Sequence, residues 1–181
     1  MRLGRAETRK FGHNDPNAAA EEIAQWRASG GDGQIWIAIE AVYSMEGALA
    51  PLTAMCSLAF REDAVLVVDE AHATGLFGDL GRGLAHGIAH RPKVLTLHTC
   101  GKALGASGAL ICGARVLIET LINRARGFIF ATAPSAKKGR VWLWRLNCSG
   151  RGSTSGVFAR RQCHRARPDC GFPSLERLSS R

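Results

Sequence analysis

An uninterrupted apolar run, Val65 to Val68, ends in the acidic pair Asp69-Glu70. Four successive aliphatic residues do not alternate with polar ones, and this is typical of a strand that is covered on both faces in a parallel sheet. The carboxyl ends of such strands are where open α/β sheets present ligands. The run therefore predicts an α/β fold and places Asp69 at the edge of the sheet where a site is expected.

Helical and strand patterns alternate along much of the chain. Asp15 and Pro16 are typical of a helix N-cap and first residue, and we expect helices over 16–29, 51–62 and 114–123. Strands are expected at 34–39, near Val65, near Val94, at 109–112 and at 128–131, and a glycine-rich loop at 75–83. This alternation predicts a three-layer α/β/α fold with a mostly parallel sheet.

A lysine lies in a glycine-flanked loop just after the strand expected near Val94. Glycine permits tight backbone turns, so Lys102 can approach a bound molecule closely. A carboxylate and an amine at the ends of neighbouring strands suit pyridoxal 5'-phosphate, because the carboxylate keeps the pyridine nitrogen protonated and the amine binds the aldehyde as a Schiff base. The ordinary alternatives are an Asp69 that caps the next helix and a solvated lysine; their pairing favours the cofactor.

An apolar strand that ends in Asp-Glu-Ala-His also occurs in DEAH-type helicases, where it binds magnesium. Such a protein needs a phosphate-binding loop, G-x-x-x-x-G-K-[ST], before that strand. The only Gly-Lys pair, Gly101-Lys102, comes after the acidic strand, is followed by Ala103, and has Thr96 where the first glycine should stand. The nucleotide-binding alternative therefore fails on both order and chemistry.

Five motifs follow one another between Phe11 and Ser135: GHNDPN, EAVYSMEGALAPL, VLVVDEAHATGLFGDLGRG, TLHTCGKALGASGAL and RGFIFATAPS. Together they resemble the α-oxoamine synthase family of fold-type I pyridoxal phosphate enzymes, and within it most of all the 8-amino-7-oxononanoate synthases. The same ordered motifs are shared by the 2-amino-3-ketobutyrate ligases, 5-aminolevulinate synthases and serine palmitoyltransferases.

The resemblance implies a catalytic role for three residues. Lys102 is expected to form the Schiff base with the cofactor, Asp69 to pair with the pyridinium nitrogen, and His72 to hydrogen-bond the phenolic oxygen of the ring. His72 has an ordinary alternative, a histidine whose ring is satisfied by a backbone carbonyl. His98 lies in the lysine motif, and the sequence assigns it no role.

The resemblance implies cofactor contacts for four more residues. Ser44 and Thr99 are expected to touch the cofactor, and Glu40 to be a further acid of the site. Hydroxyl residues in loops are more often turn formers, and Glu40 has the alternative of a solvated strand end. Thr132 is expected to reach the phosphate of the partner subunit's cofactor, so the resemblance also implies a homodimer.

The implied reaction is the decarboxylative condensation of an amino acid with an acyl thioester. For the favoured members these are L-alanine and a pimeloyl thioester, of coenzyme A or a carrier protein, in biotin biosynthesis. The alternatives are a synthase of the 2-amino-3-ketobutyrate ligase or 5-aminolevulinate synthase type, and a remnant without activity. The charged first ten residues do not suit a signal peptide and no apolar run suits a membrane span, so we expect a cytoplasmic protein without a membrane or nucleic-acid partner.

With 181 residues, the chain has about half the length that the resemblance implies. We therefore expect residues 1–135 to be part of a cofactor-binding large domain. By the same resemblance, this part lacks the N-terminal gating segment and the small domain whose arginine binds the substrate carboxylate. Because two walls of the pocket would then be absent, we expect weak cofactor binding and little or no turnover from this chain.

Charge sets the last part of the chain apart. Residues 1–135 carry 13 Lys+Arg and 13 Asp+Glu, whereas residues 136–181 carry 11 and 2, so the net charge of +9 lies in this tail. The tail leaves the family pattern at Ala136 and shows no sustained helical or strand periodicity. We expect it to be poorly ordered, as the product of a shifted reading frame or of a fusion.

Two functional alternatives for the tail remain. The first is a nucleic-acid-binding arm, whose affinity would fall steeply with salt. The second is a zinc site, and its candidate ligands are Cys148, Cys163, His164 and Cys170. Zinc ligands usually come in closely spaced pairs, and these do not, so we expect no metal.

Overall fold

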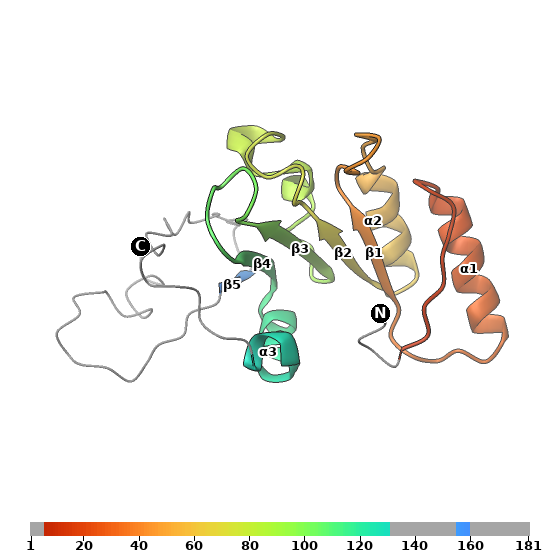
Figure 1. Ribbon diagram of the computed structural model, residues 1–181. Helices are drawn as coiled ribbons and strands as arrows, with labels where there is room; N and C mark the ends of the chain where they lie inside the picture. Colours follow the sequence, from red (N-terminus) through yellow and green to blue (C-terminus); the bar gives the residue numbers. More distant parts are fainter. Residues whose placement is uncertain (1–5, 131–154, 160–181) are drawn as a thin grey trace.

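The computed structural model describes residues 6–130 and the strand at 155–159. In this part, five strands form one sheet in the order β1-β2-β3-β4-β5 (Figure 1). They are β1 (Trp36–Glu40), β2 (Val65–Asp69), β3 (Val94–Thr99), β4 (Ala109–Ala114) and β5 (Ser155–Ala159). The first three run parallel, and β4 and β5 are each antiparallel to the strand before them in the sheet. The α/β fold is confirmed, with a mixed sheet.

The change of direction between β3 and β4 follows from the length of the connection. Two parallel neighbours need a crossover of about a dozen residues or more, usually with a helix. Residues 100–108 connect β3 to β4 without a helix, so the chain turns back and β4 pairs antiparallel to β3. The sequence predicted a strand here, but its direction depends on this loop.

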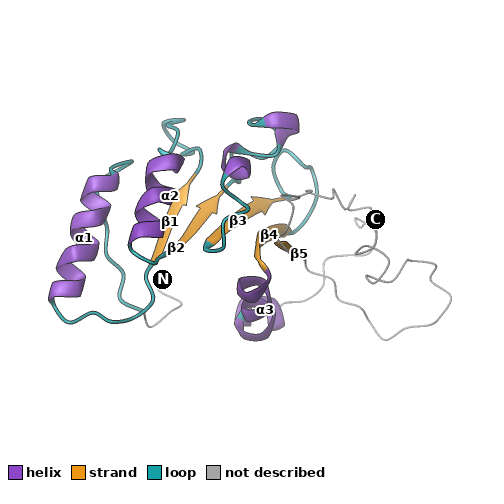
Figure 2. Ribbon diagram, turned by 180° about the vertical axis from the view of Figure 1, so that it is seen from behind, coloured by secondary structure: helices purple, strands orange, loops and turns teal. Residues whose placement is uncertain are grey.

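Helices cover both faces of the sheet. α1 (Pro16–Ala28) and α2 (Leu52–Arg61) pack on one face, and α3 (Arg115–Arg124) packs on the other, near β4 (Figure 2). α1 begins as expected, because the Asp15 carboxylate accepts hydrogen bonds from the backbone N–H groups of Asn17 and Ala18, with Pro16 as the first helical residue. The three-layer arrangement is therefore confirmed.

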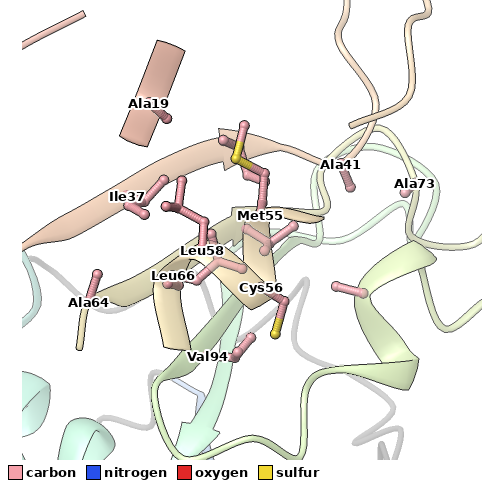
Figure 3. Packing of buried hydrophobic residues seen from close by; sticks show 14 of the residues in the cluster. Ala19, Ile37, Ala41, Met55, Cys56, Leu58, Ala64, Leu66, Ala73 and Val94 are labelled. Carbon is pink, nitrogen blue, oxygen red and sulfur yellow. The ribbon is translucent and has the colours of Figure 1, made fainter. Parts of the chain in front are cut away.

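The larger core lies between α1, α2 and the sheet (Figure 3). Met55 on α2 and Leu66 on β2 are fully buried at its centre. Other members from these elements are Ala19, Ile23, Ile37, Ile39, Cys56, Leu58, Ala59, Val68 and Val94. A smaller cluster on the other face joins Val65 and Leu95 to Ile118 of α3.

These two clusters fix the direction in which each strand residue points. Successive side chains of a strand lie on opposite faces. Leu66 and Val68 belong to the larger core, and Val65 belongs to the cluster under α3. Asp69 therefore lies on the α3 face, and Glu70 points into the α1 and α2 side of the molecule.

Three details differ from the expectations. β1 has only one buried face, since Trp36 and Ala38 are exposed. The strand expected at 128–131 is wrong: α4 (Arg126–Ile129) occupies that place, and Phe128 and Ile129 donate their N–H groups to the Ala125 carbonyl. A short apolar run fits either structure, and here the local hydrogen bonds select the helix. β5, within the expected tail, was not predicted.

The glycine-rich loop at 75–83 is confirmed and contains one short 3-10 helix, η1 (Asp79–Gly81); a second, η2 (Leu84–Gly87), follows it. Among the described residues, no helix is both long and apolar enough to span a membrane.

Candidate active site

The carboxyl ends of the three parallel strands bring the candidate residues to one edge of the sheet. Glu40, the last residue of β1, is paired in register with Asp69, the last residue of β2. Asp69 is opposite Leu97 of β3, so Thr99 lies two residues farther along the same face of that strand. The loops that follow β1, β2 and β3 lie at this edge (Figure 1).

Asp69 is half-buried, and one of its two carboxylate oxygens accepts a hydrogen bond from the backbone. Its Oδ1 accepts a hydrogen bond from the backbone N–H of Ala71 at 2.8 Å, a local turn contact that asparagine and aspartate often make. This is close to the capping role considered from the sequence. In the described part of the chain, Oδ2 accepts no hydrogen bond, so the carboxylate keeps one oxygen for a ligand.

Lys102 and His72 meet at the same edge, although 30 residues separate them. The Nζ of Lys102 lies 2.6 Å from Nε2 of His72. A lysine ammonium can only donate, so Nε2 of His72 is the acceptor when an ammonium makes this contact. His72 therefore contacts the lysine, and no backbone carbonyl satisfies its ring among the described residues.

The remaining candidates lie in different surroundings. Ser44 is exposed in the turn after β1, where Gly47 donates its N–H to the Tyr43 carbonyl. Thr99 Oγ1 accepts a long hydrogen bond, 3.5 Å, from the backbone N–H of Gly101. Both contacts agree with the turn-forming alternative as well as with a cofactor contact. Thr132 lies outside the described residues.

Tyr43, which the sequence did not single out, lies beside Glu40. Burial raises the pKa of its phenol above the usual value, and the Glu40 carboxylate adds to that rise while a hydrogen bond to the Glu40 backbone opposes it. The Tyr43 ring also meets the His13 ring edge-on, with centroids 4.4 Å apart. These contacts place the GHNDPN motif against the start of the Ser44 turn.

Glu70 is a second carboxylate that the sequence did not assign. It is fully buried, and it accepts hydrogen bonds from the backbone N–H groups of Leu84, at 3.1 Å, and Ala85. Burial raises the pKa of Glu70, while these two N–H groups oppose the rise. Gly83 makes the approach possible, because a Cβ built there would lie 2.4 Å from Oε2 of Glu70. The carboxylate thus anchors the end of the 75–83 loop.

His98 is another buried polar residue at this edge, with 4% of its surface exposed. Burial lowers its pKa from 6.5 to about 4, and the charge of Asp69 acts in the opposite direction. Strand alternation predicts that His98 points inward. One of its hydrogen-bond partners, Thr96, is two residues away on the same strand, whereas the other, Thr74, comes close only through tertiary structure and could not be predicted from a sequence pattern.

The residues present fit a pyridoxal phosphate ring. An exposed lysine amine, an imidazole in contact with it and a carboxylate oxygen to which no described residue donates are located at one edge of the sheet. An amine and a carboxylate are the groups that such a cofactor needs at its aldehyde and at its ring nitrogen.

Comparison with known proteins agrees with this chemistry. Residues 1–138 match the family model described as aminotransferase class I and II. An 8-amino-7-oxononanoate synthase of Herminiimonas arsenicoxydans is 43% identical over 139 residues, which are 75% of this chain and 35% of the relative. That of Chromobacterium violaceum is 44% identical over 133 residues, 72% of this chain and 33% of the relative. The chain thus spans about a third of the length of these relatives.

Solved structures give the same fold. The serine palmitoyltransferase of Sphingomonas wittichii matches with a TM-score of 0.64 and 30% identity, over 72% of this chain and 32% of that chain. A serine palmitoyltransferase structure that contains pyridoxal phosphate matches with a TM-score of 0.60 and 28% identity, over the same shares. These neighbours are fold-type I pyridoxal phosphate enzymes, and the expected resemblance is confirmed. The chain belongs to the aminotransferase class I and II family.

Proposed function

We propose that this chain carries the cofactor-binding residues of a pyridoxal phosphate-dependent α-oxoamine synthase of the 8-amino-7-oxononanoate synthase type. The observation that carries the proposal is the contact between Lys102 Nζ and His72 Nε2 at 2.6 Å, at the sheet edge where β2 ends in Asp69. The names of the curated relatives support the choice of this type.

Each of the three residues has a separate task. When bound, pyridoxal phosphate supplies a ring that accepts the electrons of a bond broken at the α-carbon of an amino acid. Asp69 holds a proton on the ring nitrogen through its uncommitted oxygen. Lys102 would hold the aldehyde carbon through its amine, and the same amine would serve as the general base for the α-proton of the substrate.

His72 contacts Lys102 Nζ, the atom that would bond to the aldehyde carbon of the cofactor. The phenolic oxygen of the cofactor is on the ring carbon next to the one that carries the aldehyde, so a side chain in contact with Lys102 Nζ is within reach of that oxygen. Glu40, Ser44 and Thr99 are proposed to complete the cofactor contacts. Thr132 is proposed to reach the cofactor of a partner subunit, and the active form is proposed to be a homodimer.

The proposed substrates are L-alanine and a pimeloyl thioester, and the product is a precursor of biotin. We propose that residues 1–135 belong to the large domain and that residues 136–181 are a non-native tail. The cytoplasm is the proposed compartment, because Cys56 and Cys100 in the described part are buried free thiols, as expected of a reducing environment. We expect low or no ketone formation from this chain.

Trapping the cofactor tests the proposal without turnover. The chain is incubated with pyridoxal phosphate, reduced with borohydride and digested, and the modified lysine is identified by mass spectrometry. We expect the modification at Lys102, its loss in Lys102→Ala, and its retention in Lys93→Ala. Lys93 is a matched control, because its ammonium is bound to the Asp63 carbonyl and carboxylate at the opposite end of β3. Modification spread over many lysines would overturn the proposal.

The amino acid decides between members of the family. An amino acid that competes with Lys102 for the cofactor would lower the borohydride labelling of Lys102. We expect L-alanine to do so at lower concentration than glycine or L-serine. Stronger protection by glycine would favour the 2-amino-3-ketobutyrate ligase or 5-aminolevulinate synthase type, and stronger protection by serine would favour a serine palmitoyltransferase.

A further inference from the structure

A buried chain of hydrogen bonds runs behind the Lys102–His72 contact. His98 Nδ1 lies 2.8 Å from Thr74 Oγ1, and His98 Nε2 lies 2.9 Å from Thr96 Oγ1. Thr74 Oγ1 also donates to the backbone carbonyl of Glu70 at 2.8 Å. His98, Thr74 and Thr96 are each at most 6% exposed, so water does not compete for these bonds.

The protons of this chain can be assigned. A threonine hydroxyl has one hydrogen to donate, and that of Thr74 goes to the Glu70 carbonyl. Thr74 Oγ1 therefore accepts from His98 Nδ1–H, which leaves Nε2 as the acceptor for the hydroxyl of Thr96. A neutral imidazole satisfies every partner in this arrangement, whereas a second ring proton would lose the acceptor at Nε2.

The hydrogen bonds join the two segments that carry the candidate catalytic residues. Thr74 lies two residues after His72, on the turn that follows β2, and His98 lies four residues before Lys102, near the end of β3. Backbone hydrogen bonds join these two segments as far as the one that Glu70 N–H donates to the Leu97 carbonyl, at 2.8 Å. Beyond it, the Thr74–His98 bond connects the turn to the strand.

We propose that His98 is a positioning residue, which ties the turn carrying His72 to the strand leading to Lys102 and so keeps these two side chains within contact distance. The effect of this tether on cofactor binding rests on the proposed function. An aliphatic residue would fill the same buried space at lower desolvation cost, so packing alone does not account for a histidine with a partner on each ring nitrogen.

Two substitutions of similar shape distinguish a tethering role of His98 from a packing role. The amide nitrogen of asparagine occupies about the place of Nδ1, and that of glutamine about the place of Nε2. His98→Asn therefore keeps the bond to Thr74. His98→Gln loses that bond and retains only a contact with Thr96, whose hydroxyl oxygen then accepts from the amide nitrogen. Thr74→Val removes the tether from its other end with little change of shape, and Thr96→Val removes the bond that does not reach the turn.

The first measurement is hydrogen exchange of the cofactor-free chain, read by mass spectrometry on peptides that cover residues 70–78 and α1. We expect exchange at 70–78 to rise about fivefold to tenfold in His98→Gln, as the loss of one buried hydrogen bond allows. It should rise at least as much in Thr74→Val, which also loses the hydrogen bond to the Glu70 carbonyl. It should remain near the unmodified chain in His98→Asn and Thr96→Val, and α1 should be unchanged in all four variants.

The second measurement is the borohydride labelling of Lys102 by pyridoxal phosphate, which should fall in His98→Gln and Thr74→Val and be retained in His98→Asn. Equal exchange in the asparagine and glutamine variants, or a rise that includes α1, would show a packing role and overturn the inference. If the unmodified chain is not labelled at Lys102, the proposed function fails, while the exchange result still decides whether His98 tethers the turn.

Discussion

The buried imidazole of His98 makes the stability of the fold depend on pH in a definite direction. Burial lowers the pKa of His98 from 6.5 to about 4, whereas in the unfolded chain the pKa returns to its ordinary value. Between these two values the unfolded state binds more protons than the folded state, so stability falls as the pH falls. Each unit of difference in pKa corresponds to about 1.4 kcal/mol, so the titration of His98 lowers the free energy of unfolding by about 3 kcal/mol by pH 4.

Urea unfolding of the unmodified chain and of His98→Asn, at pH values from 7 to 4, measures this contribution. The asparagine cannot titrate, so the free energy of unfolding of the unmodified chain should fall by about 3 kcal/mol more than that of the variant over this range. Glu70, whose pKa burial raises, acts in the opposite direction in both proteins and cancels in the comparison. Parallel pH profiles would refute a neutral, buried His98.

Four further substitutions test the fold, each by urea unfolding. Gly83→Ala should lower the free energy of unfolding by about 1–3 kcal/mol, because φ is +93° and the new Cβ would lie 2.4 Å from Oε2 of Glu70. A loss under about 0.5 kcal/mol would show that the loop moves to accommodate the methyl group. Met55→Ala should cost about 2–5 kcal/mol, and Phe60→Ala, 82% exposed on the same helix, almost nothing; similar costs would place the core elsewhere. Asp15→Ala should cost about 0.5–2 kcal/mol through the lost cap, and an unchanged stability would contradict the capping hydrogen bonds.

What the sequence predicted well depends on local physics. The cap at Asp15, the apolar run of β2 and the helical spacing of α2 act over a few residues, and each appears in the structure close to its expected position. The edge location of Asp69 and Lys102 follows from the same patterns, because parallel strands end together.

What the sequence did not predict depends on tertiary contacts. The partners of Glu70 are the N–H groups of Leu84 and Ala85, and His98 meets Thr74 of the turn after β2 as well as Thr96 of its own strand. The contacts with Glu70 and with Thr74 exist only once the chain is folded. The helix at 126–129 was mistaken for a strand because its apolar residues are too few to show a period.

The central claim is that Asp69 and Lys102 serve one cofactor ring, and nitrogen NMR of the bound cofactor tests it most directly. Pyridoxal phosphate labelled with ¹⁵N in the ring is bound to the unmodified chain and to Asp69→Asn, with attachment to Lys102 checked by mass spectrometry. We expect a protonated ring nitrogen in the unmodified chain and an unprotonated one in the variant. A ring nitrogen in the same protonation state in both proteins would contradict the claim.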